Sequence, residues 1–126
     1  MKKIVLILIL VIFTACKKEN QEQGDKSDDN NSSLSQIEMG KQLFENKGNC
    51  YSCHLADKKL IGPSAQEIAK IYKEKNGNMV AFLKEEAQPI VDPTQYDIMK
   101  TNFSITEEMS DEELEALEAY IYSTIK

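Results

Sequence analysis

The sequence predicts an all-α protein. Three Ser-x-x-Glu capping boxes, typical of helix starts, stand directly ahead of amphipathic runs, and they begin at Ser35, Ser64 and Ser110. Apolar residues in those runs recur at helical spacing, and no useful length of the chain alternates like a strand. The 126 residues suffice for one small core. We therefore expect about four short helices in a single domain at residues 35–126.

The first two helices precede and follow a cysteine-containing segment. The first is expected from Ser35 to the segment 47–49, where Gly48 and Asn49 favour a helix end. Its apolar and small side chains are Ile37, Met39, Gly40, Leu43 and Phe44. The second is expected at about 65–75, with Asn76 and Gly77 as the stop signal. Its inward residues are Ile68, Ala69, Ile71 and Tyr72.

Two more helices complete the predicted domain. One is expected from about Met79 to Ala87, because Pro89 cannot continue a helix. The last is expected at about 111–125. Its apolar residues at helical spacing are Leu114, Leu117, Tyr120 and Ile121.

The N-terminal residues differ from the rest of the chain. Two lysines precede an unbroken apolar run over 4–13, and Thr14, Ala15 and Cys16 follow it. This order is typical of an export signal and resembles a bacterial lipoprotein signal, so residues 1–15 are expected to be removed and Cys16 to be lipidated. Ordinary cleavage that leaves a free thiol, or an unprocessed anchor, are the alternatives. Residues 16–34 are expected to form the anchor cysteine and a flexible acidic tether, because they offer almost no apolar surface to bury.

The segment Cys50-Tyr51-Ser52-Cys53-His54 fits the C-x-x-C-H pattern of covalent haem attachment. Thiols three positions apart lie on the same side of one turn and can form thioethers with the two vinyl groups of one porphyrin, and the adjacent imidazole can bind the iron. A redox-active dithiol, a structural disulfide and a zinc site are the alternatives. A thioredoxin-type dithiol requires a strand-helix-strand context, and zinc requires a fourth ligand; the sequence offers neither.

The other axial position of the iron is less well determined. His54 is the single histidine, so bis-histidine coordination within the chain is excluded and a methionine, a lysine, an exogenous ligand or an open site remains. Met99 is favoured because it is expected in a loop after Pro93, from which a side chain can reach the iron. Met109, Met79 and an open site remain alternatives.

The order of motifs resembles that of the small bacterial class I cytochromes c over about residues 36–126. The matching features are Gly40 to Phe44, Cys50 to His54, Gly62-Pro63, Met99, and a final helix with Leu117 and Tyr120. The resemblance implies a class I fold wrapped around one haem c.

The same resemblance implies roles for individual residues. Cys50 and Cys53 would bind the haem covalently, and His54 and Met99 would be its axial ligands. The carbonyl of Pro63 would hold the other ring nitrogen of His54. The first and last helices would cross through Gly40, Phe44, Leu117 and Tyr120.

These features favour a carrier of single electrons between respiratory-chain components rather than an enzyme, because no residue is expected to act as an acid, base or nucleophile. A haem peroxidase or gas-binding module with an open sixth position, and an accessory cytochrome subunit of an oxidase or reductase, are the alternatives.

The charge and the anchor bear on partners and location. The net charge is −6, and nucleic-acid binding is disfavoured because it needs a basic surface. Redox partners with basic docking faces are expected instead. The expected location is the periplasmic side of a bacterial membrane, held by the lipid, with an outer-membrane lipoprotein or a secreted protein as alternatives.

Overall fold

The computed structural model describes residues 28–126, and the expected signal peptide, Cys16 and the first part of the expected tether lie outside these residues. The described part is helical and contains no strand, which confirms the all-α prediction. Its α-helices are α1 (Asp28–Glu45), α2 (Ala65–Lys75), α3 (Met79–Leu83), α4 (Tyr96–Met99), α5 (Phe103–Thr106) and α6 (Asp111–Ser123). Single 3₁₀ turns are η1 (Cys50–Ser52), η2 (Pro93–Gln95) and η3 (Lys100–Asn102). No helix in this part is both long and apolar enough to cross a membrane.

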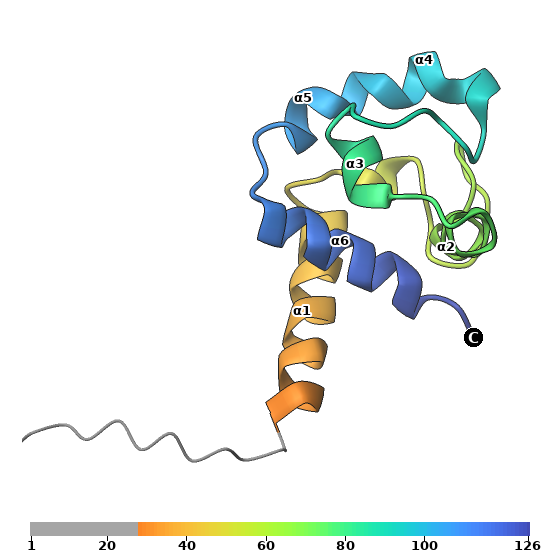
Figure 1. Cartoon of the computed structure of the whole chain (residues 1–126). Helices are drawn as coiled ribbons and strands as arrows, with labels where there is room; N and C mark the ends of the chain where they lie inside the picture. The colour runs from red at the N-terminus through yellow and green to blue at the C-terminus, as the bar shows by residue number, and fades with distance from the viewer. Residues whose placement is uncertain (1–27) are drawn as a thin grey trace, which may run out of the picture.

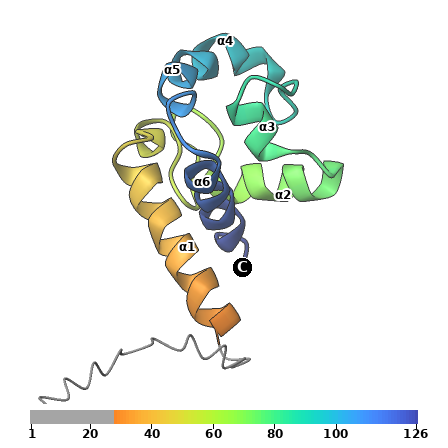
Figure 2. The ribbon, with the colours of Figure 1, turned by 60° about the vertical axis from the view of Figure 1, so that its left-hand side comes forward.

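The central packing contact is the crossing of α1 and α6, which Figure 1 and Figure 2 both show. Gly40 makes the crossing close, since a Cβ atom there would lie 1.8 Å from the backbone oxygen of Ala116. Beside it, the rings of Phe44 and Tyr120 meet edge to face with centroids 5.2 Å apart. Leu117 is buried in the same core. The predicted crossing of the first and last helices is therefore confirmed.

Helix α2 packs on the other side of α6, so that α6 lies between α1 and α2 in Figure 2. It begins and ends where predicted: Ser64 caps it by accepting a hydrogen bond from the backbone N–H of Glu67, and Asn76 closes it in the left-handed conformation. Residues from these helices and from α3 form one core. Its members include Leu43, Phe44, Ala69, Tyr72, Met79, Leu83, Leu114, Leu117 and Ile121.

Two predicted helix boundaries are wrong. Helix α1 begins at Asp28, within the stretch assigned to the tether, and Ser35 does not cap it, because its hydroxyl donates to the carbonyl of Ser32 inside the helix. A helix extends at small cost once its first turn has formed. Helix α3 ends at Leu83, ahead of the predicted Ala87. The chain turns there because Glu85 adopts a positive φ of 60°. A positive φ is uncommon for glutamate, so the sequence does not predict this turn.

The segment that carries Met99 is not the predicted loop. It forms η2, α4, η3 and α5 in succession, and Figure 1 shows this chain of short helices at the top of the molecule. Pro93 fits the first turn of a helix because its missing N–H is not needed there, and the Asp92 carboxylate caps that turn by accepting from the N–H of Thr94. The buried Thr106 hydroxyl then donates to the carbonyl of Leu83 at 2.8 Å, which ties α5 to α3.

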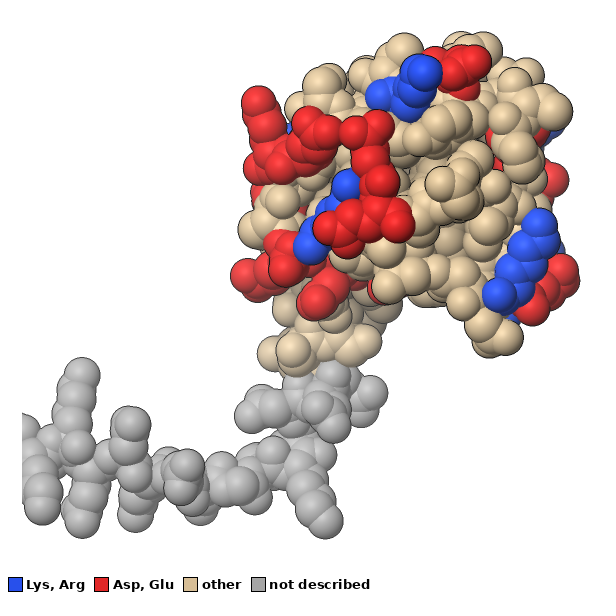
Figure 3. All heavy atoms as spheres, turned by 45° about the horizontal axis from the view of Figure 1, so that its top comes forward, with Lys and Arg blue, Asp and Glu red and all other residues tan. Residues whose placement is uncertain are grey.

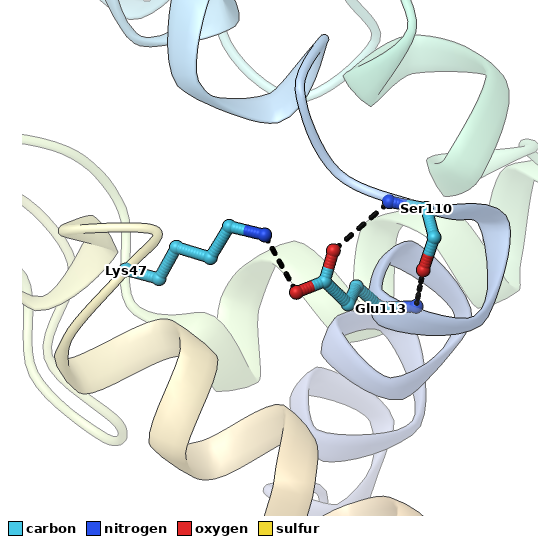
Figure 4. Close-up of polar contacts among 3 residues, drawn as sticks. All are labelled: Lys47, Ser110 and Glu113. Carbon is cyan, nitrogen blue, oxygen red and sulfur yellow. Dashed lines mark hydrogen bonds and ion pairs between the residues drawn. The ribbon is translucent and has the colours of Figure 1, made fainter.

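A polar cluster joins the end of the first helix to the start of the last (Figure 4). The predicted capping box at Ser110 is confirmed: its backbone N–H donates to the Glu113 carboxylate, and the N–H of Glu113 donates to the Ser110 hydroxyl. The other Glu113 oxygen accepts from the Lys47 ammonium at 2.6 Å, and this contact lowers the pKa of the Glu113 carboxyl. The chain just before Cys50 is thereby held against the start of α6.

Replacing Gly40 by alanine tests the crossing. Helix propensity alone would make Gly40→Ala stabilising by about 1 kcal/mol. The added Cβ would instead collide with the Ala116 carbonyl, so we expect a loss of roughly 1–3 kcal/mol in the free energy of unfolding, measured by denaturant titration. Ser35→Ala, at an exposed position of the same helix, is the control. A stabilised Gly40→Ala protein would show that the helices do not approach closely.

Candidate functional site

A cavity of about 250 Å³ brings the predicted site residues together. Cys50, Cys53, His54 and Met99 all border it. Apolar side chains from the packed helices make up much of the rest of its wall. They include Phe44 of α1, Ile68 of α2, Phe82 and Leu83 of α3, and Leu117 and Ile121 of α6. The helix faces that were predicted to point inward therefore line this cavity as well as forming the core.

The two cysteines lie on a single turn. Asn49, in the left-handed conformation, leads into η1, and the N–H groups of Cys53 and His54 both donate to the Cys50 carbonyl, at 3.1 and 2.9 Å. Burial raises the pKa of the Cys50 thiol to about 11, and both cysteines are free thiols. A reactive dithiol requires a lowered thiol pKa, so the Cys50 environment is the opposite of what the dithiol alternative needs.

His54 is oriented by a backbone carbonyl. Its Nδ1 atom lies 2.7 Å from the carbonyl oxygen of Pro63, which is the hydrogen bond that the resemblance implied. A carbonyl can only accept, so Nδ1 carries the proton and donates, and Nε2 is the nitrogen with a free lone pair. The imidazole therefore has the tautomer that an axial ligand needs.

Gly62 gives the imidazole its room. A Cβ atom at this position would lie 2.5 Å from Cε1 of His54 and 2.9 Å from Nδ1. The N–H of Gly62 also donates to the Cys53 carbonyl at 2.9 Å, so the loop folds back on the cysteine turn. The Gly62-Pro63 pair thus shapes the ring's pocket through one residue and fixes its orientation through the other.

The methionines occupy different environments. Met99 is half-buried at the end of α4 and borders the cavity. Met79 also borders it but is a nearly fully buried member of the core. Met109 is buried in the core and is not among the residues that line the cavity. The assignment of Met99 as the axial ligand stays a prediction, with Met79 the alternative that the cavity also admits.

Some of the residues at the cavity wall were predicted from the sequence, and others were missed. The rings of Phe82, Tyr96 and Phe103 contact one another with centroids 5.3 to 6.3 Å apart, and Phe82 and Tyr96 border the cavity. Phe82 belongs to the helix expected from Met79, whereas Tyr96 and Phe103 belong to the short helices α4 and α5, which were not predicted. Asn102, three positions after Met99, also borders the cavity and carried no motif. Tyr72, which was predicted as an inward residue of the second helix, borders it too, and its buried hydroxyl has no hydrogen-bond partner among the described residues.

These residues fit a covalently attached haem. Much of the wall is apolar, as a porphyrin ring needs, and two thiols and a correctly oriented imidazole stand together in it. Met99 can offer a thioether. Among the described residues, no three His, Cys, Asp or Glu side chains are grouped to hold a metal ion, which is what the zinc alternative would need.

Replacing Gly62 by alanine tests how His54 is held. The added methyl group must displace the imidazole from the Pro63 carbonyl, so we expect Gly62→Ala to alter the ferric absorption spectrum of the haem-loaded protein. We also expect its unfolding free energy to fall by roughly 1–3 kcal/mol. Lys58→Ala, exposed in the same loop, should match the wild type. An unchanged spectrum and stability for Gly62→Ala would contradict this geometry.

Comparison with known proteins assigns the chain to a family. The family model named Cytochrome c matches residues 37–124, a stretch that includes every residue of the cavity. No curated protein matches the chain. The family implies covalently bound haem and electron transfer, in agreement with the thiols and imidazole on the cavity wall. The chain belongs to the cytochrome c family and is a haem-binding electron-transfer protein.

Proposed function

We propose that this protein is a monohaem cytochrome c that carries single electrons between respiratory-chain components at a bacterial membrane surface. The observation that carries the proposal is that Cys50, Cys53, His54 and Met99 border a single apolar cavity. The two thiols would attach the haem, and the imidazole and the thioether would be its axial ligands. The bound haem supplies a reversible one-electron couple.

The residues around the cavity suit a carrier. Pro63 keeps the His54 imidazole in a fixed tautomer and orientation, which raises its basicity as a ligand. The largely apolar wall would shield a bound haem from water. Axial coordination by methionine raises the reduction potential, and a closed sixth position suppresses ligand chemistry.

The two alternatives differ from this proposal in separate ways. A peroxidase or gas-binding module would leave the sixth position open and would use polar distal groups, but the chain has no second histidine and no arginine. Met99 at the cavity wall favours the carrier. An accessory subunit would share the carrier's coordination and differ in its partner, so it would copurify with a membrane complex.

Leucine substitutions identify the sixth ligand. Leucine keeps the approximate volume of methionine but cannot bind iron, so Met99→Leu should lose the charge-transfer band of the iron-sulfur bond in the ferric protein. The ferric Met99→Leu protein should also bind cyanide much faster than the wild type. Met79→Leu and Met109→Leu are the matched variants and should keep the band. Loss of the band in Met79→Leu alone would move the ligand to Met79, and a wild-type protein that is high-spin and binds cyanide at once would favour the open-site alternative.

An acidic surface supports partners with basic docking faces. Figure 3 shows acidic side chains gathered on one side of the face that carries α4 and α5. The Lys84 ammonium forms an ion pair with Asp111, and Asp111, Glu86 and Glu115 together raise its pKa. The neighbouring Glu107 raises the pKa of the Glu85 carboxyl, and Glu85 in turn raises the pKa of Lys100, the residue after Met99. The acidic surface therefore extends toward the proposed ligand.

Charged small oxidants test this surface without a known partner. Neutralising Glu85 and Glu107 together (Glu85→Gln, Glu107→Gln) should speed oxidation of the ferrous protein by anionic ferricyanide at low salt, because repulsion falls. Glu74→Gln, exposed on α2, is the matched control and should change the rate little. Equal rates in all proteins would mean that electrons leave by another face.

The membrane part of the proposal rests on Cys16. Its signal-like flank supports lipidation, and a polar tether would let the haem domain reach partners near the surface. Intact mass of the mature protein should show a lipid on an N-terminal Cys16, and the Cys16→Ser protein should carry no lipid. A mature chain that starts elsewhere, or one that starts at Cys16 without a lipid, would contradict the anchor.

A further inference from the structure

We propose that Asn102 is a positioning residue that fastens the Met99 segment to the turn that carries Cys50. The proposal rests on the proposed role of Met99 as the axial ligand. It adds a residue to which no motif pointed.

The link is a hydrogen bond between distant parts of the chain. Nδ2 of Asn102 donates to the carbonyl oxygen of Gly48 at 3.0 Å, and the bond is half-buried. Asn102 ends η3, three positions after Met99, and borders the cavity. Gly48 is buried two positions before Cys50, and its own N–H donates to the Leu43 carbonyl at the end of α1. The bond therefore connects the segment of the proposed distal ligand to the segment that carries the attachment site.

The other polar contacts of this segment are local. The Thr101 hydroxyl donates to the carbonyl of Ile98, and the Lys100 ammonium pairs with Asp97. Among the hydrogen bonds of the described residues, the one from Asn102 is the bond that ties residues 96–102 to a distant segment. Without it, no hydrogen bond among the described residues would tie residues 96–102 to a distant segment.

The Gly48 carbonyl also faces Cys50. The Cys50 thiol donates to this same oxygen at 3.4 Å. Thioether formation adds the S–H bond across a vinyl group: sulfur bonds to one vinyl carbon and the hydrogen goes to the other. The thiol donor is then lost, and the Asn102 amide becomes the side-chain donor left for Gly48. After covalent attachment, the Gly48 carbonyl therefore depends more on the hydrogen bond from Asn102.

Asn102→Leu in the haem-loaded protein tests the proposal. Leucine removes the donor at similar volume, so the Met99 segment should open more often. Imidazole should bind the ferric iron roughly two- to tenfold faster, as expected for loss of one partly buried hydrogen bond. The charge-transfer band of the iron-sulfur bond should also weaken. Ser104→Ala, an exposed position whose hydroxyl bonds only to the nearby Thr101 carbonyl, should match the wild type in both readouts.

The outcomes separate this inference from the function on which it rests. If Met99→Leu loses the band while Asn102→Leu keeps the wild-type band and imidazole rate, the positioning role is wrong and Met99 is still the ligand. If Met99→Leu keeps the band, both assignments are wrong. A lower melting temperature of Asn102→Leu with an unchanged imidazole rate would also overturn the proposal. Should Asn102→Leu yield no haem-loaded protein, Asn102→Ala in the same assays decides by the same criteria.

Discussion

The close contact between Gly40 and the backbone of Ala116 is the constraint on which the rest of this structure depends. It lets α1 and α6 cross with little between them, and this crossing brings the end of α1 near the start of α6, where Lys47 reaches Glu113. The two crossing helices also contribute Phe44 and Leu117 to the cavity wall. Because the cysteine turn follows α1 directly, the position of the attachment site is set by how these helices meet.

Much of the fold could be predicted because its signals are local. Ser64 and Asn76 bound α2 as expected, and the capping box at Ser110 starts α6. The errors occur where no local signal exists: the early start of α1 and the turn at Glu85. The helical character of the Met99 segment was missed because Pro93 suggested a loop, although proline suits a first helical turn.

The candidate site also contains residues that a local sequence signal reveals and residues that it does not. Cys50, Cys53 and His54 are adjacent in sequence, and the bond from His54 to Pro63 spans nine positions, so a motif could reveal them. The bond from Asn102 to Gly48 spans 54 positions. The contacts of the Phe82 ring with the rings of Tyr96 and Phe103 join separate short helices. Such contacts depend on the folded chain and leave no periodic trace in the sequence. They also decide how tightly the distal side of the cavity is held.

The account as a whole depends on a haem joined through sulfur to the turn at residues 50–54. Intact mass spectrometry of the denatured protein, produced in a host that matures c-type cytochromes, tests this most directly. We predict a coloured protein whose mass exceeds that of the processed chain by one haem, with the excess on the peptide that contains Cys50 and Cys53. A colourless product with the mass of the polypeptide alone, apart from any lipid, would contradict the account.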